Sequence, residues 1–101
     1  MLAARHILLE YGRTKKRSGE EALLLAKDLR ERVMDGESFA DLAGAYSDCP
    51  SSSEGGFLGV FLRGDMDPDF EQALLALQVG EVSMPVRTVN GIHIIRREAP
   101  L

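Results

Sequence analysis

The sequence predicts an α+β fold in which a small sheet is covered by helices. Three observations support this class. Residues 4–10 alternate in the manner of a strand, residues 19–35 repeat apolar side chains at helical spacing, and Asn90-Gly91 separates two stretches rich in β-branched residues. The expected order is strand, helix, helix, strand, helix, strand, strand. This pattern alone indicates a small mixed sheet, without internal repeats or linkers.

Residues 4–10 are expected to form the first strand. Ile7 and Leu9 would lie on one face and His6 and Leu8 on the other, because successive side chains alternate along a strand. A histidine among apolar neighbours is either a hydrogen-bonded core residue or part of a site. The sequence leaves both interpretations of His6 open.

A polar loop at residues 12–19 follows this strand and carries Arg13 and a run of three basic residues, Lys15, Lys16 and Arg17. We expect the three side chains to be flexible and exposed, as those of most basic segments are. The alternative is a basic patch beside a cleft, which would favour acidic groups of a peptide.

Two helices are expected after the loop. Ser18 and Glu21 have the spacing of a capping box, and Gly36 suits the left-handed residue that ends a helix. Ser38 would cap a shorter helix over residues 39–46. Each helix carries one apolar stripe, so both are expected to be structural.

The chain is organised around residues 47–70, which are expected to form the wall of a binding cleft. This stretch contains the only cysteine, Cys49, then a loop of small residues and an apolar segment at 57–62. Asp67-Pro68 predicts the start of a third helix, since aspartate caps free amides and proline fits the first helical position. Three apolar side chains lie close to the cysteine along the chain: Leu58, Met66 and Phe70.

The chain is expected to end in a β-hairpin. Residues 84–89 and 92–97 flank Asn90-Gly91, a dipeptide typical of a type I′ turn, because that turn needs two positive φ angles. His93 would then share one face of the last strand with Ile95, opposite Ile92 and Ile94.

Length and composition limit the class of protein. With 101 residues, the chain is expected to be one domain over residues 1–101 and a monomer. A net charge of -4 argues against general binding to nucleic acid or membrane surfaces, which favours a basic face. One cysteine cannot form an internal disulfide, and the first residues lack the charged and apolar regions of a signal peptide. We therefore expect a cytoplasmic protein.

Six short motifs carry a resemblance that extends from Arg5 to Arg97. They are Arg-His-Ile-Leu at 5–8, Phe-Ala-Asp-Leu-Ala at 39–43, Tyr-Ser-Asp-Cys at 46–49, Gly-Gly-Phe-Leu-Gly-Val-Phe at 55–61, Arg-Gly-Asp-Met at 63–66 and Asn-Gly-Ile-His-Ile-Ile at 90–95. Each motif alone is weak. In this order and spacing, together they resemble the parvulin family of peptidyl-prolyl cis/trans isomerases.

The resemblance implies a four-stranded antiparallel sheet surrounded by helices, with the first and last strands adjacent at its centre. His6 and His93 would then lie side by side on one face. The implied activity is rotation about X-Pro bonds in peptides and in unfolded or partly folded proteins. It would proceed without covalent chemistry, cofactor or metal.

The resemblance also implies a set of site residues. The implied catalytic residues are His6, Cys49 and His93, with Cys49 at a position that holds cysteine or aspartate in the family. The implied substrate-binding residues are Leu58, Phe61, Met66, Asp67, Phe70, Thr88 and Asn90. Asp67 stands where many members have glutamine.

The residue preferred before proline follows from the loop after the first strand. Members selective for phosphorylated Ser/Thr-Pro carry a basic cluster there, including a lysine near the end of the strand. Here Glu10 occupies that position, and Lys15, Lys16 and Arg17 lie in a shorter loop. We therefore expect broad specificity, with at most a mild, salt-sensitive preference for an acidic residue.

Three other functions compete with the isomerase. A cysteine hydrolase would use Cys49 as nucleophile and His6 or His93 as base. The same three residues could instead bind zinc. A non-catalytic proline-peptide-binding or chaperone module is the third alternative, and an isomerisation assay would separate it from the enzyme.

Overall fold

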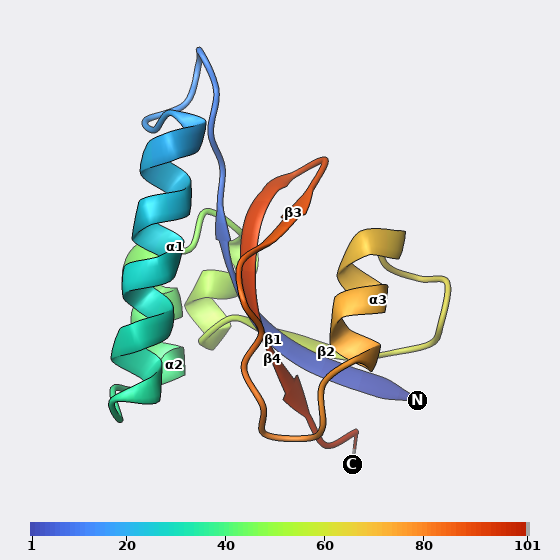
Figure 1. Cartoon of the computed structure of the whole chain (residues 1–101). Helices are drawn as coiled ribbons and strands as arrows, with labels where there is room; N and C mark the ends of the chain where they lie inside the picture. The colour runs from blue at the N-terminus through green and yellow to red at the C-terminus, as the bar shows by residue number, and fades with distance from the viewer. Residues whose placement is uncertain (101) are drawn as a thin grey trace.

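The computed structural model describes residues 1–100, and Leu101, the last residue of the predicted domain, lies outside them. The predicted order of elements is confirmed, with a short 3-10 helix in addition (Figure 1). The strands are β1 (Leu2–Leu9), β2 (Phe57–Phe61), β3 (Val86–Thr88) and β4 (Gly91–Glu98). The helices are α1 (Gly19–Met34), α2 (Phe39–Tyr46), the 3-10 helix η1 (Pro50–Glu54) and α3 (Pro68–Leu75).

The four strands form one sheet in the order β2-β1-β4-β3. The first and last strands pair at its centre, from Ala3 opposite Glu98 to Leu9 opposite Ile92. The three strand pairings are antiparallel, so the antiparallel sheet is confirmed and the mixed sheet suggested by the pattern alone is wrong. Element order did not settle strand direction, because a connection that contains helices can return the chain either way.

Helices cover both faces of the sheet. In Figure 1, α1 and α2 lie on one side of the β1–β4 pair and α3 lies on the other. The core toward α1 and α2 is formed by Ile7, Leu9, Ala22, Ala26, Leu29, Phe39, Leu42, Ala43, Ile92 and Ile94. The core toward α3 is formed by Leu2, Ala4, Phe61, Phe70, Leu74 and Ile95. The predicted alternation along β1 and β4 is therefore confirmed.

The predicted ends of α1 and the predicted start of α3 are confirmed, whereas α3 ends at Leu75, two residues before the expected Leu77. Ser18 and Glu21 form the capping box of α1, with Glu21 N–H donating to Ser18 Oγ at 3.1 Å and Ser18 N–H donating to Glu21 Oε1 at 2.8 Å. Gly36 follows α1 with φ 106°, and Asp67 caps α3 ahead of Pro68. None of the helices within residues 1–100 is long and apolar enough to cross a membrane.

The β3–β4 hairpin is present, but its predicted turn type is wrong. Thr88 pairs with Gly91, so Val89 and Asn90 are the two loop residues. Within residues 1–100 only glycines have positive φ, which excludes a type I′ turn at Asn90. Asn90 N–H instead donates to Thr88 Oγ1 at 3.1 Å. Gly91 is needed for a close approach, since a Cβ there would lie 2.5 Å from the carbonyl oxygen of Leu9.

Candidate active site

A cleft of about 280 Å³ lies on the α3 side of the sheet, over the β1–β4 pair. Ten residues line it, and eight of them are residues that the sequence predicts: His6, Cys49, Leu58, Met66, Asp67, Phe70, Asn90 and His93. The structure therefore brings together side chains from β1, β4, α3, β2 and the segments around them. Their roles in catalysis stay predictions.

Two further lining residues, Leu8 and Asp65, were missed as site residues. Leu8 follows His6 by two positions on β1, so strand alternation already placed both on one face. Asp65 lies beside Met66, and its carboxylate accepts from Leu62 N–H at 3.0 Å. The sequence does indicate Asp65, because it precedes Met66 directly in the motif at residues 63–66.

Two predicted substrate contacts do not line the cleft. Phe61 is 9% exposed and packs in the α3-side core together with Phe70. Thr88 is buried next to His93 on the neighbouring strand. Both side chains pack behind residues that line the cleft. A motif match alone does not distinguish a residue that lines a cleft from one that packs behind it.

The two histidines form a buried, hydrogen-bonded pair. Leu8 is opposite His93 on the paired strands, which makes His6 its diagonal neighbour on the same face. The Nδ1 atoms of His6 and His93 lie 3.0 Å apart, and the rings are stacked with centroids 5.1 Å apart. On the other side, His93 Nε2 lies 2.8 Å from Thr88 Oγ1. The predicted side-by-side placement is confirmed.

In this geometry one Nδ1 carries a hydrogen and donates it in a hydrogen bond to the other Nδ1, which accepts. Two neutral rings satisfy this requirement. Burial lowers the pKa of His6 to about 4, with a further contribution from the charge of His93. Burial also lowers the pKa of His93 to about 4, although the Asp67 carboxylate acts in the opposite direction. Both imidazoles are therefore neutral near pH 7.

The remaining nitrogen of this pair, Nε2 of His6, is buried and has no hydrogen-bond partner within residues 1–100. Buried polar atoms in folded proteins almost always have a partner. An unpaired imidazole nitrogen in a residue that lines a cleft is a feature typical of a functional site.

Cys49 is held at the edge of the cleft by the segment before it. Ser47 Oγ accepts from the N–H groups of Leu8 and Cys49 at 3.0 and 3.4 Å, and Asp48 N–H donates to the carbonyl oxygen of Leu8 at 2.7 Å. The thiol is half-buried. It makes no hydrogen bond to either histidine among the described residues.

The loop of small residues after Cys49 is ordered as the 3-10 helix η1. At its end, Gly56 carbonyl accepts from His6 N–H at 3.0 Å, and a Cβ at Gly56 would lie 2.4 Å from the carbonyl oxygen of His6. The Arg5 guanidinium donates to the carbonyls of Glu54 and Gly55 at 3.2 and 3.0 Å. These contacts fix the Cys49 segment to the strand that carries His6.

Phe70 joins the apolar side of the cleft to the histidine pair. Its ring meets His6 and His93 edge-on, with centroid separations of 5.7 and 5.3 Å. Leu58 and Met66 line the same cleft. Asp67 holds this arrangement in place, because its carboxylate accepts from the N–H groups of Asp69 and Phe70 at the start of α3.

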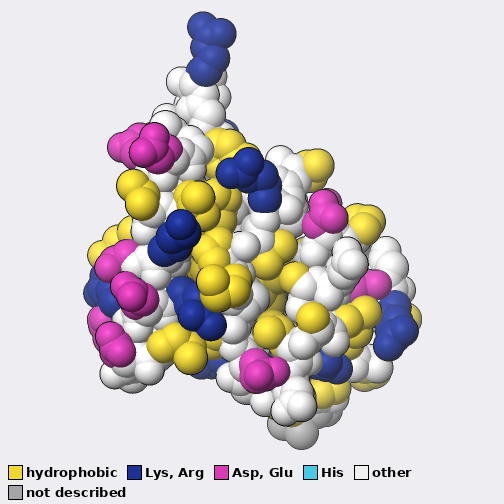
Figure 2. Space-filling view, viewed as in Figure 1, with side chains coloured by type: hydrophobic (Ala, Val, Ile, Leu, Met, Phe, Trp, Pro, Cys, Tyr) yellow, Lys and Arg dark blue, Asp and Glu magenta, His cyan; other side chains and the backbone are white. Residues whose placement is uncertain are grey.

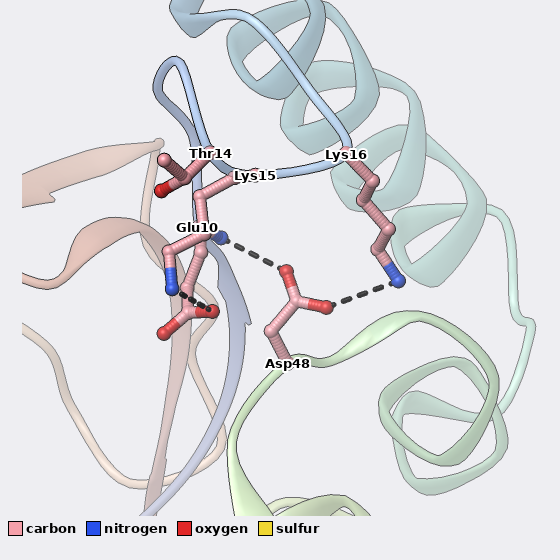
Figure 3. A pocket seen from close by; sticks show the side chains of 5 residues that line it. All are labelled: Glu10, Thr14, Lys15, Lys16 and Asp48. Carbon is pink, nitrogen blue, oxygen red and sulfur yellow. Dashed lines mark hydrogen bonds and ion pairs between the residues drawn. The ribbon is translucent and has the colours of Figure 1, made fainter.

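The basic loop lines a neighbouring pocket of about 270 Å³ with Glu10, Thr14 and Asp48 (Figure 3). Lys15 Nζ lies 3.4 Å from the Glu10 carboxylate, and Lys16 Nζ lies 3.1 Å from Asp48 Oδ1. Both lysines therefore have a carboxylate partner within the protein.

Arg17 departs from its prediction as a flexible, exposed cation. Its side chain is only 11% exposed and forms a hydrogen-bonded ion pair with Asp48 Oδ2. Burial raises the pKa of the Asp48 carboxyl, but hydrogen bonds from the Glu10 backbone, Arg17 and Lys16 outweigh this effect and lower that pKa overall. Composition and order identify a basic loop but not its partner, since Asp48 lies 31 residues from Arg17 along the chain.

The zinc alternative finds no support in this geometry. Across residues 1–100, no group of three or more histidine, cysteine, aspartate or glutamate side chains is placed to hold a metal ion. The ligand set that the alternative requires, Cys49 with His6 and His93, is therefore not assembled.

Comparison with known proteins gives consistent results. Residues 6–99 match the family model described as rotamase, PPIC-type PPIase domain. A peptidyl-prolyl cis-trans isomerase pin1 from Rhizopus delemar is 50% identical over 84 residues, which cover 82% of this chain and 56% of the relative. The chaperone SurA of Chromohalobacter salexigens is 48% identical over 95 residues, which cover 93% of this chain and 21% of that protein.

Solved structures agree with these relatives. The peptidyl-prolyl isomerase ESS1 from Candida albicans superimposes with a TM-score of 0.91 at 34% identity, over 97% of this chain and 62% of the other. The chain spans about half of the length of the Rhizopus relative and about a fifth of the length of SurA.

Proposed function

Since the chain belongs to the parvulin, or PPIC-type, family of peptidyl-prolyl cis/trans isomerases, we propose that it catalyses rotation about X-Pro bonds in its cleft. The substrates would be proline-containing peptides and unfolded or partly folded proteins. The observation that carries the proposal is the contact of Phe70 with both histidines, which places an apolar surface directly beside a neutral, buried imidazole pair.

The chemistry requires no covalent step. Rotation about an X-Pro bond has a barrier of roughly 20 kcal/mol, because amide resonance is lost when the bond twists. Leu58, Met66 and Phe70 would hold the proline ring, while Cys49 and the neutral histidines provide less polar surroundings for the carbonyl than water does. Such surroundings disfavour the charge-separated planar amide relative to the twisted one, which lowers the barrier.

Cys49 would act through hydrogen bonding and its local electrostatic field. A nucleophile needs a base within hydrogen-bond reach, and the Cys49 thiol makes no hydrogen bond to either histidine among the described residues. This arrangement favours the isomerase over the cysteine hydrolase.

Specificity before proline would be broad. Lys16 and Arg17 pair with Asp48, and Lys15 pairs with Glu10, so two carboxylates offset two of these three positive charges and weaken the attraction for a phosphate. A mild preference for an acidic residue that disappears at high salt is the expected behaviour.

A non-catalytic proline-peptide-binding or chaperone module is the second candidate, because several relatives are named chaperone SurA or foldase protein PrsA. Exchange NMR on an Ala-Pro peptide with a small fraction of the protein separates the two. The enzyme produces cis–trans exchange peaks that grow with protein concentration. A binding module shifts the peptide signals without accelerating exchange, which would overturn the proposal.

The remaining proposals concern the setting of the protein. We propose that residues 1–101 act as one monomeric domain in the cytoplasm, without nucleic-acid or membrane partners and without a cofactor. The negative net charge and the single cysteine support this setting. Sedimentation equilibrium and cell fractionation test it.

A further inference from the structure

A second groove lies between α1 and the segment that leads into β3. It has a volume of about 380 Å³ and is lined by Lys27, Arg30, Glu31, Met84 and Pro85. It shares no lining residue with the cleft that contains the histidines. Figure 2 faces this region and shows hydrophobic side chains between α1 and β3, with Lys or Arg side chains along both sides. We call it the α1 groove.

The α1 groove presents apolar surface that the fold does not cover. Met84 is 63% exposed beside Pro85. On α1, Met34 is 59% exposed and lies one turn after Arg30, two turns after Lys27 and three turns after the partly buried Leu23. Methionine side chains adapt their shape to different apolar partners, so this surface suits an apolar side chain from another chain.

The backbone at the wall of the groove is anchored by hydrogen bonds. Ser83 N–H donates to the Ile95 carbonyl at 2.7 Å, and Ser83 Oγ accepts from Ile95 N–H at 3.0 Å. Arg30 Nε donates to the Ser83 carbonyl at 3.0 Å, which ties α1 to the same segment. The backbone next to Met84 is therefore fixed before any partner binds, which reduces the backbone entropy lost on binding.

The cations around the groove lack acidic partners. Lys27 and Arg30 form no ion pair within residues 1–100. Arg13, Arg63, Arg87 and Arg97 also lack one there, but only Lys27 and Arg30 line this groove. Glu31 is the one carboxylate among the lining residues. Two unpaired cations beside one carboxylate leave the groove with a net positive charge, which attracts a negatively charged partner locally even on a chain of net charge -4.

From this combination we propose that the α1 groove binds a peptide segment that carries carboxylates on both sides of a large aliphatic residue. The aliphatic side chain contacts Met84 and Pro85, and the carboxylates pair with Lys27 and Arg30. The volume suits one side chain and its adjoining backbone. A second copy of this chain is a poorer partner, because a symmetric contact would bring the same cations against each other.

The test uses the whole chain and a proline-free peptide, acetyl-Glu-Asp-Leu-Leu-Glu-Asp-amide, followed by amide chemical-shift changes. The expected changes centre on Lys27, Arg30 and Met84 and leave His6 and His93 unchanged. Lys27→Glu should weaken binding roughly threefold to tenfold, because it replaces an attraction with a repulsion. Met84→Ala should weaken it by a similar factor at unchanged charge. An uncharged version of the peptide, with Gln and Asn in place of Glu and Asp, should bind more weakly than the acidic peptide.

Arg13→Glu is the matched control, since Arg13 is exposed on the loop after β1 and lies outside both lining sets. Equal loss of binding in Arg13→Glu and Lys27→Glu would show general charge attraction and overturn the proposal. Shift changes centred on Met66 and Phe70, or the absence of binding, would also overturn the proposal. So would the same shift changes at the groove when the protein concentration is raised without any peptide, because they would show self-association. Isomerisation of a short Ala-Pro peptide should be the same in Lys27→Glu and wild type, so this test is independent of the proposed activity.

Discussion

The two faces of the β1–β4 strand pair are equally buried but differ in chemistry. Toward α1 and α2, the strands present Ile7, Leu9 and Ile94, which are almost completely buried in an apolar core. Toward α3, the same strands present His6 and His93, which are 4% and 3% exposed. The first face gains free energy from burial alone. The second buries two imidazoles and must keep them neutral and hydrogen-bonded.

Under the proposed function, this difference separates stability from activity within one sheet. On the apolar face, a truncated side chain leaves a cavity, and the cost appears in the free energy of unfolding. On the histidine face, the cost of burying polar groups is offset by the contacts among His6, His93 and Thr88. We therefore expect substitutions on the two faces to alter different measurements.

The largest effect should come from the apolar face. Ile94→Ala should lower the free energy of unfolding by about 2–5 kcal/mol, because a completely buried side chain is replaced by a cavity. Urea denaturation measures this change. Val79→Ala, at a position that is 58% exposed, is the control and should change the free energy little. Equal effects of the two substitutions would contradict the assignment of the core.

The histidine face should make the domain sensitive to acid. The pKa values of His6 and His93 are about 4 in the folded protein and near 6.5 in the unfolded chain. Between about pH 4 and pH 6.5, the unfolded chain therefore binds more protons than the folded protein does. The contribution of the pair is fully present above about pH 6.5 and should decline as the pH falls toward 4. The expected loss is a few kcal/mol in the free energy of unfolding.

Unfolding measured across this pH range in wild type and His6→Asn separates the histidines from the carboxylates. The carboxylates titrate in both proteins, so the difference in slope reports His6. Equal slopes in the two proteins, or imidazole NMR signals that titrate near the ordinary histidine pKa, would refute a buried neutral pair.

Cys49 should affect activity moderately. Cys49→Asp keeps a polar acceptor at the edge of the cleft and should retain isomerisation within about tenfold of wild type, whereas Cys49→Ala should lose more. The side chain is half-buried, so neither change should alter folding strongly. Detection of a covalent peptide adduct at Cys49 by mass spectrometry would show that the histidine face works by bond formation.

The smallest effect concerns the residue before proline. Rates for Glu-Pro and Ala-Pro peptides should differ by roughly threefold at low salt and converge at high salt, because the loop cations are paired and partly exposed. A preference for phospho-Ser-Pro of about a hundredfold that survives high salt would show that Asp48 and Glu10 do not neutralise the loop.

The sequence predicts the elements well where local chemistry decides. The capping box at Ser18, the cap at Asp67 and the alternation around His6 and His93 are confirmed, because each depends on neighbours within a few residues. The type I′ turn is wrong for the opposite reason. Gly91 serves a close approach to Leu9, a residue 82 positions away that periodicity does not reveal.

Most of the cleft is also predictable, but the layer behind it is not. The motifs identify Met66 and Phe70, whereas the position of Phe61 in the core and of Arg17 against Asp48 depends on long-range packing. Phe70 itself belongs to both, since it is 2% exposed in the α3-side core and also lines the cleft. Phe70→Ala would therefore reduce folding and binding together, and Met66 is the better residue for a test of the cleft.

The measurement that tests the account most directly is the rate of Ala-Pro isomerisation by wild type, Met66→Ala and Leu62→Ala, with unfolding measured for each. Met66 lines the cleft, while Leu62 is 59% exposed outside the lining set and serves as the matched truncation. Met66→Ala should reduce kcat/KM by about tenfold or more, because part of the proline-ring contact is lost, and Leu62→Ala should stay within about twofold of wild type. A folded Met66→Ala variant with full activity would show that the proline ring binds elsewhere and would contradict the account.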